Sequence, residues 1–124
     1  MKSLLIVAAF ATLLSVPTAA DAFKVGDLGA MPSRRACVET AAKVLETYVA
    51  EHGGLSTSGD PSDPQSWSFY GWGLRPGMTD AVIICPIVGN QGNAFYTLHS
   101  SGDAGAKAAD VTAEHIRTLW QDLR

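Results

Sequence analysis

The chain has 124 residues, of which 47% are apolar and 17% charged, and its net charge at pH 7 is −3. This composition is typical of a folded globular protein and excludes a disordered chain. The mild acidic balance offers no basic surface, so we expect no nucleic-acid partner. The length suffices for one modest core and excludes a two-domain enzyme.

The amino-terminal segment has the pattern of a secretory signal peptide. Lys2 supplies a positive charge, residues 4–16 are uncharged and apolar, and the sequence Ala-Asp-Ala at 20–22 fits a small-x-small cleavage site. The apolar run is too short for a transmembrane helix, which needs about 20 residues. We therefore predict that residues 1–22 are removed and that residues 23–124 form a single small domain without a membrane span. The protein is then periplasmic or secreted.

The chain has two cysteines, Cys37 and Cys85. An even count in a small exported chain predicts a disulfide bond. A catalytic thiol would need a neighbour that stabilises the thiolate, and a metal site would need more than two ligands. Closing the loop between the two cysteines should stabilise the fold by about 4 kcal/mol at most.

Residues 32–52 have helical periodicity. Their apolar stripe comprises Cys37, Ala41, Val44, Leu45, Tyr48, Val49 and His52. Ser33 can cap the amino terminus of this helix, and Gly53 with Gly54 ends it. Residues 55–66 are rich in Ser, Asp, Gly and Pro, which predicts a surface loop.

Three strands and a second helix follow. Residues 67–72 have strand composition, and a type II turn at 75–78 leads to a second strand at 80–88. A five-residue connection at 89–93 leads to a third strand at 94–100.

Residues 106–123 carry a broad apolar face and predict the second helix. The fold class is then α+β, in the order helix, three-stranded antiparallel meander, helix. The disulfide joins the first helix to the middle strand. Folding about the first turn pairs residue 67 or 68 with Cys85, so Pro86 lies beyond the end of the first strand and its missing N–H is not needed there.

The two faces of the meander follow from its register. If Val88 pairs with Ala94, the face that meets the first helix carries Ile83, Cys85, Ile87, Phe95, Thr97 and His99. The other face then carries Val82, Ile84, Pro86, Val88, Tyr96 and Leu98. This second face is too apolar to be solvated, so we expect the C-terminal helix to cover it and to form a third layer. The alternative covers are a second subunit, a partner protein or an apolar ligand.

Aromatic residues are concentrated on the first and third strands. Those on the first strand occupy both of its faces, so they cannot all enter one core. Tyr70 and Trp72, or else Trp67 and Phe69, are therefore candidates for a binding surface, and Tyr96 on the third strand joins the set. The alternative is that these rings wrap the sheet edge and cover the core.

Arg34 and Arg35 lie in the first turn of the first helix. Together with free backbone N–H groups, this pair could hold an anion. The alternative is that both side chains are solvated or paired with an acid such as Asp27, Asp60 or Asp63.

The three histidines, His52, His99 and His115, show no local metal-binding spacing, and no nucleophile or phosphate-binding motif occurs. We therefore expect no metal and no cofactor, and a non-enzymatic binding or accessory protein of unknown ligand. It would act as an accessory protein, an inhibitor or a carrier of a small ligand, through the aromatic strand edge or the second sheet face. Its partner is then another protein, or a second copy of the chain in a homodimer, bound through an apolar sheet face. The alternative is a small hydrolase or transferase that uses His99 with an acid brought close by the fold.

Overall fold

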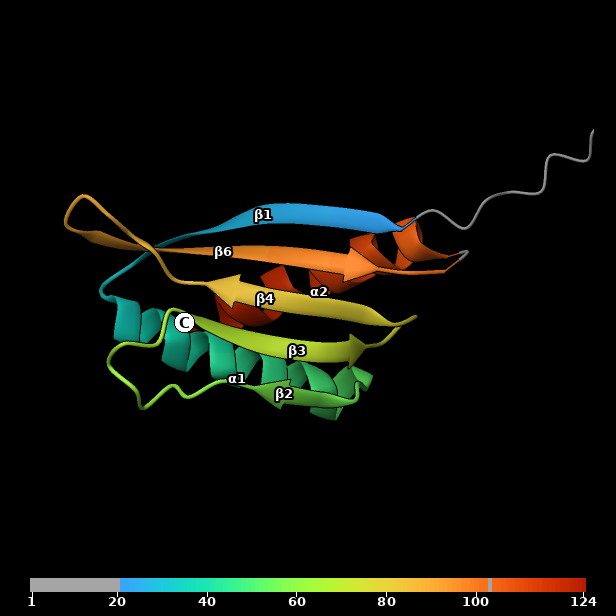
Figure 1. Ribbon diagram of the computed structural model, residues 1–124, viewed down its shortest axis with the longest axis horizontal. Coiled ribbons are helices and arrows are strands. Elements are labelled where there is room, and N and C mark those ends of the chain that lie inside the picture. Colours follow the sequence, from blue (N-terminus) through green and yellow to red (C-terminus); the bar gives the residue numbers. More distant parts are fainter. Residues whose placement is uncertain (1–20, 103) are drawn as a thin grey trace, which may run out of the picture.

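The computed structural model describes residues 21–102 and 104–124. They form an α+β fold of two helices and a six-stranded antiparallel sheet (Figure 1). In chain order the elements are β1 (Ala22–Met31), α1 (Arg34–His52), β2 (Ser56–Ser58), β3 (Ser68–Leu74), β4 (Thr79–Ile84), β5 (Ile87–Val88), β6 (Gln91–Ser100) and α2 (Gly105–Leu123). The sheet order is β1-β6-β4-β3-β2, and β5 pairs with β6. Except for Asp21 and Ala22, the predicted signal peptide lies outside the described residues.

Helix α1 begins and ends as its sequence predicts. The Ser33 side chain accepts a hydrogen bond from the backbone N–H of Ala36 at 3.0 Å, which satisfies one of the free donors of the first turn. The helix ends at His52, and Gly53 follows with a φ of 93°, a conformation that glycine adopts without strain.

The first predicted hairpin is confirmed in its register. Ser68 pairs with Ile84, and the N–H of Cys85 donates to the carbonyl of Trp67 at 2.7 Å. Pro86 comes next and lies between β4 and β5, outside both strands. Its missing N–H therefore breaks no pair with β3, as the sequence indicated.

The second predicted hairpin differs from the structure. The predicted strand at 80–88 is interrupted at residues 85–86, and β5 and β6 are joined by only two residues, Gly89 and Asn90. Gly89 has a φ of 64°, which a tight hairpin turn requires. Val88 consequently pairs with Gln91 rather than with Ala94. This shift changes the parity of the pairing, so the predicted face assignment was wrong.

Two strands enlarge the predicted meander. β1 pairs with β6 along its whole length, although its sequence was assigned no element. β2 lies within the predicted loop at 55–66 and pairs with the outer edge of β3. The three predicted strands are thus only the middle of a wider sheet, and the loop is shorter than expected.

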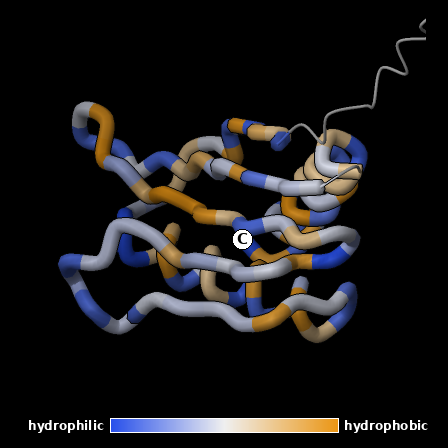
Figure 2. The backbone as a smooth tube through the Cα atoms, turned by 45° about the vertical axis from the view of Figure 1, so that its right-hand side comes forward, coloured by the Kyte–Doolittle hydropathy of each residue, from blue (hydrophilic) through white to orange (hydrophobic). Residues whose placement is uncertain are grey.

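Both helices lie on the same face of the sheet (Figure 1). α1 packs mainly on β3, whereas α2 packs on β1 and β6 and against α1. Lys24 of β1 forms an ion pair with Asp110 of α2. The predicted three-layer arrangement was therefore wrong, because the six-stranded sheet is wide enough to hold two helices side by side. Figure 2 shows that apolar segments occur on the strands as well as on the helices.

The core lies between the sheet and the two helices. Its largest fully buried side chains are Trp120, Tyr48, Tyr96, Leu45, Leu74, Ile83, Leu98 and Ile116. Gly26 of β1 allows close packing there, because a Cβ atom at this position would lie 2.2 Å from the ring of Tyr96. The helix-facing residues of the sheet are thus buried in the core.

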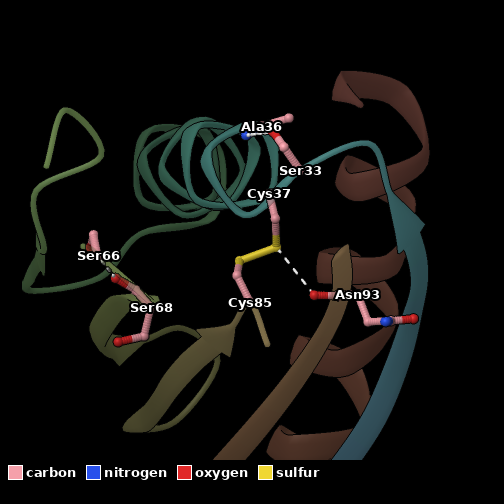
Figure 3. The surroundings of a disulfide bond; sticks show 7 residues. All are labelled: Ser33, Ala36, Cys37, Ser66, Ser68, Cys85 and Asn93. Atoms are coloured by element: carbon pink, nitrogen blue, oxygen red, sulfur yellow. Dashed lines mark hydrogen bonds between the residues drawn. A yellow bond between two sulfur atoms is a disulfide. The ribbon is translucent and has the colours of Figure 1, made fainter. Parts of the chain in front are cut away.

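The disulfide bond joins α1 to the residue that follows β4 (Figure 3). Cys37 and Cys85 are both fully buried, and their Cα atoms are 5.8 Å apart. The Cys37 sulfur also lies 3.6 Å from the carbonyl oxygen of Asn93 on β6. The predicted pairing is confirmed, and it fixes α1 against the middle of the sheet.

Replacing both cysteines, as Cys37→Ala with Cys85→Ala, should lower the free energy of unfolding by up to about 4 kcal/mol, because the unfolded chain regains the entropy of a 48-residue loop. Urea denaturation of the two proteins measures this difference. Reduced wild-type protein serves as the control, since it lacks the bond but keeps both sulfur atoms. Equal stability of the oxidised wild type and the variant would contradict the prediction.

Candidate binding surface

The face of the sheet opposite the helices is uncovered in the described part of the chain. Strand pairing arranges its side chains in rows that cross four strands. The middle row comprises Tyr70, Val82, Thr97 and Val25. The neighbouring rows comprise Ser68, Ile84, Phe95 and Asp27 on one side, and Asp80, His99 and Phe23, with Trp72 nearby, on the other. We call these twelve residues the open sheet face.

The open sheet face leaves large apolar side chains in contact with solvent. Phe23 is 77% exposed and Val25 is 71% exposed, while Trp72 and Tyr70 are 40% and 37% exposed. An uncovered face of an antiparallel sheet is normally polar. Large exposed apolar patches on monomeric proteins are often interaction sites, so this face is the candidate binding surface.

A shallow cavity of about 240 Å³ lies in the open sheet face. Val82 and Thr97, on the two central strands, line its floor. One side is formed by residues of β1, including Phe23, and the other by Tyr70 and Trp72 of β3. The face is therefore not flat, because aromatic side chains stand on both sides of a hollow.

Tyr70 and Trp72 form a rigid pair. Their rings are nearly parallel, with an angle of 3° between the planes and 5.6 Å between the centroids. Trp72 Nε1 donates to the Ser58 hydroxyl at 2.8 Å, and the Ser68 hydroxyl donates to the Tyr70 hydroxyl at 3.1 Å. Because both rings are already held, a partner that contacts them loses little side-chain entropy on binding.

The other aromatic candidate, Tyr96, lies on the helix-covered face. It is fully buried, beside Gly26, and the Arg117 guanidinium lies 5.5 Å from the centre of its ring. The predicted register, which was wrong, placed Tyr96 on the same face as Val82, whereas Tyr96 pairs with Ile83. The structure thus separates Tyr96 from Tyr70 and Trp72.

The two candidate arginines point to different partners. The Arg34 guanidinium lies over the ring of Trp67, 3.5 Å from its centroid. Arg35 forms an ion pair with Glu39 one turn further along α1, at 2.8 Å. Since α1 lies behind the sheet, neither side chain belongs to the open sheet face.

Phe23 and Val25 are the functional candidates that sequence reasoning missed. Only residues 23–26 around them alternate between apolar and other residues, which is a short and weak signal of a half-buried strand. No element was predicted for these residues. In the structure they form one side of the hollow.

His99 lies at one end of the hollow, close to carboxylates. Its Nε2 atom is 3.4 Å from a carboxylate oxygen of Asp21, and its ring stacks on that of Phe23 with 4.6 Å between the centroids. Asp80 is its cross-strand neighbour on β4. Asp21 belongs to the predicted signal peptide, so Asp80 is the acid that the mature chain keeps beside the histidine singled out by the alternative prediction.

The other two histidines meet on the far side of the sheet. The rings of His52 and His115 stack at 4.0 Å, next to the ring of Tyr48. No group of three or more His, Cys, Asp or Glu side chains that could hold a metal ion occurs among the described residues.

Tyr48 links the two helices to the first hairpin. Its hydroxyl donates to the carbonyl of Arg75, and a second hydrogen bond of 3.2 Å joins it to the hydroxyl of Thr112 on α2. Burial raises the pKa of Tyr48 above its ordinary value, and the hydrogen bond with Thr112 opposes this rise in part.

Comparisons of this chain with protein-family models, curated proteins and solved structures find no match. Within the described residues, no helix is long and apolar enough to cross a membrane.

Replacing Tyr48 by Phe should lower the free energy of unfolding by about 1–3 kcal/mol, because Thr112 and the Arg75 carbonyl lose a buried partner. Because the pKa of Tyr48 is raised, the stability that this side chain contributes depends on pH. The unfolded chain ionises Tyr48 first, so the neutral side chain stabilises the fold below pH ~10, and this contribution is lost as the pH rises further. Urea denaturation from pH 7 to 11 should show the gap between wild type and variant narrowing above pH ~10. A constant gap would contradict this role.

Proposed function

We propose that this chain is an exported, non-enzymatic binding protein that holds another protein on its open sheet face, as an accessory factor or an inhibitor. The observation that carries the proposal is the apolar face that neither helix covers. Phe23 and Val25 keep most of their apolar surface exposed. Burying such a side chain fully contributes about 1.5–3 kcal/mol, so a partner that covers several of them gains substantial free energy.

The shape of the face favours a protein over a small ligand. A pocket for a small molecule usually has about 300–1,000 Å³ and encloses most of the ligand. The hollow between Phe23 and Trp72 has only about 240 Å³ and is open to solvent. It suits the side chains of a protein surface that lies flat on the sheet.

Export is supported by two features of the chain. Cys37 and Cys85 form a buried disulfide, a bond that persists in oxidising compartments. The segment 1–22 has the charge, apolar run and cleavage pattern of a signal peptide. We propose that the mature protein begins at Phe23 and acts in the periplasm or outside the cell.

A photo-crosslinking amino acid at Thr97, on the floor of the hollow, tests the proposal in exporting cells. We expect covalent adducts with a partner, and we expect Tyr70→Ala with Trp72→Ala to reduce their yield several-fold, because the partner loses its rigid aromatic contacts. Denaturing gels measure the yield, and circular dichroism checks that the variant is folded.

Two matched controls belong to this experiment. Trp67→Ala removes an exposed ring outside the open sheet face and should leave the yield unchanged. The crosslinker at Thr118, an exposed residue of α2, should give no comparable adduct. Equal adduct yields from the wild type and the double variant would rule out Tyr70 and Trp72 as contact residues.

A second candidate function is favoured by the surroundings of His99. Asp21 is removed when the mature protein begins at Phe23, and Asp80, the cross-strand neighbour of His99, is the carboxylate that remains beside it. An imidazole beside a carboxylate is the arrangement of a general base, which a small hydrolase or transferase needs. A panel of activated esters tests this function. His99→Asn should abolish any hydrolysis that this site performs, whereas His52→Asn, on the far side of the sheet, should retain it. Full activity of His99→Asn would dispose of this candidate.

A further inference from the structure

A second cavity lies at the edge of the sheet, between β1 and the C-terminal part of α2. It has a volume of about 130 Å³ and is lined by Asp27, Leu28, Arg117, Trp120, Gln121 and Arg124. The helix residues of this set recur at the i, i+3, i+4, i+7 spacing, which places them on one side of α2. We call this the edge cavity. It shares only Asp27 with the open sheet face.

Two guanidinium groups line the edge cavity. The Arg117 guanidinium lies 5.5 Å from the centre of the Tyr96 ring. Arg124 reaches β1 at Gly29, where an added Cβ atom would lie 3.6 Å from its Nη1 atom. In the part of the chain that the structure describes, neither guanidinium takes part in an ion pair. Both therefore keep their N–H donors available for a ligand.

Trp120 adds an uncharged donor to this lining. The side chain is only 1% exposed, and its Nε1 atom is buried without a hydrogen-bond partner among residues 21–102 and 104–124. A buried N–H without a partner is unfavourable, so a ligand oxygen that reaches it is favoured. Two guanidiniums and one indole N–H thus lack an acceptor at the same place, which points to an acidic ligand.

Charge and size select a carboxylate among acidic groups. Asp27 accepts a hydrogen bond from the N–H of Gly29 at 2.7 Å, and its charge, with the carbonyl end of α2, lowers the positive potential of the cavity. The site therefore favours one negative charge over the two of a phosphate. A carboxylate carries one charge, and its two oxygens match the N–H groups of a guanidinium. The cavity is also far smaller than the pockets of about 300 Å³ or more that enclose drug-sized ligands.

We propose that the edge cavity binds a carboxylate group between Arg117 and Arg124, with the indole N–H of Trp120 as a further donor. The carboxylate belongs either to a small free acid or to the C-terminus of a peptide. A peptide end is compatible with the site because β1 lies at the edge of the sheet, where an added strand can pair. This inference goes beyond the proposed function and does not depend on it.

Titration with sodium acetate tests the site, with the indole N–H signal of Trp120 followed in proton–nitrogen NMR spectra. The changes Trp67→Phe and Trp72→Phe remove the other two indoles of the chain, so the remaining signal belongs to Trp120. We expect a saturable shift with acetate and none with sodium chloride at the same ionic strength.

Arginine variants locate the bound acetate. Arg117→Gln and Arg124→Gln should each raise the Kd for acetate about tenfold, because each removes a charged donor. Both side chains are exposed, so the fold tolerates these changes. Arg35→Gln is the matched control, since it removes the same charge from α1, where Arg35 pairs with Glu39, and it should leave the Kd unchanged.

A peptide distinguishes the two sources of the carboxylate. Tighter binding of acetyl-tetra-alanine than of acetate, lost when its C-terminus is amidated, would support a peptide end. Equal binding of the peptide acid and acetate would support a small free acid.

Three outcomes would overturn the inference. The first is a Trp120 signal that acetate leaves unmoved or that chloride shifts equally. The second is an unchanged Kd in both Arg117→Gln and Arg124→Gln, which would place the acetate elsewhere. The third is tighter binding of inorganic phosphate than of acetate, which would refute the choice of a carboxylate. The adduct yield from the crosslinker at Thr97 tests the open sheet face separately, so failure of either proposal is recognised on its own.

Discussion

The contact between the two helices determines which side of the sheet is covered. Tyr48 of α1 reaches Thr112 of α2, and the rings of His52 and His115 stack between them. Helices that touch in this way must lie on the same side of the sheet. All the apolar surface that the helices can bury is therefore taken from one face, and the other face keeps its valines and aromatic rings exposed. The candidate binding surface is a consequence of this packing.

The disulfide and the first hairpin were predictable because local signals define them. Ser33 and Gly53 mark the two ends of α1, and a pair of cysteines in a chain with a signal pattern leaves one possible bond. The turn after Leu74 then sets the pairing of β3 with β4, in which Ser68 faces Ile84. In each case a few neighbouring residues suffice, and no distant part of the chain competes with them.

The faces of the sheet were not predictable, because small shifts and distant packing decide them. The sequence Gly-Asn-Gln-Gly-Asn at 89–93 allows both a five-residue connection and a two-residue turn, and the choice exchanges the faces of β6. The broad apolar face of α2 suits either side of a sheet. Tyr70 and Trp72 could be singled out from their strand alone, but their neighbours Phe23 and Val25 come from the other end of the sheet.

The alternation of side chains along each strand separates two sets of residues with different constraints. On β1, Gly26 accommodates the buried ring of Tyr96, so its replacement disturbs the core. Val25, the preceding residue, points to the opposite side and contacts little within the chain. Evolution can therefore alter one set while it preserves the other. Substitutions at alternate positions of the same four strands can therefore change the open sheet face while the fold persists.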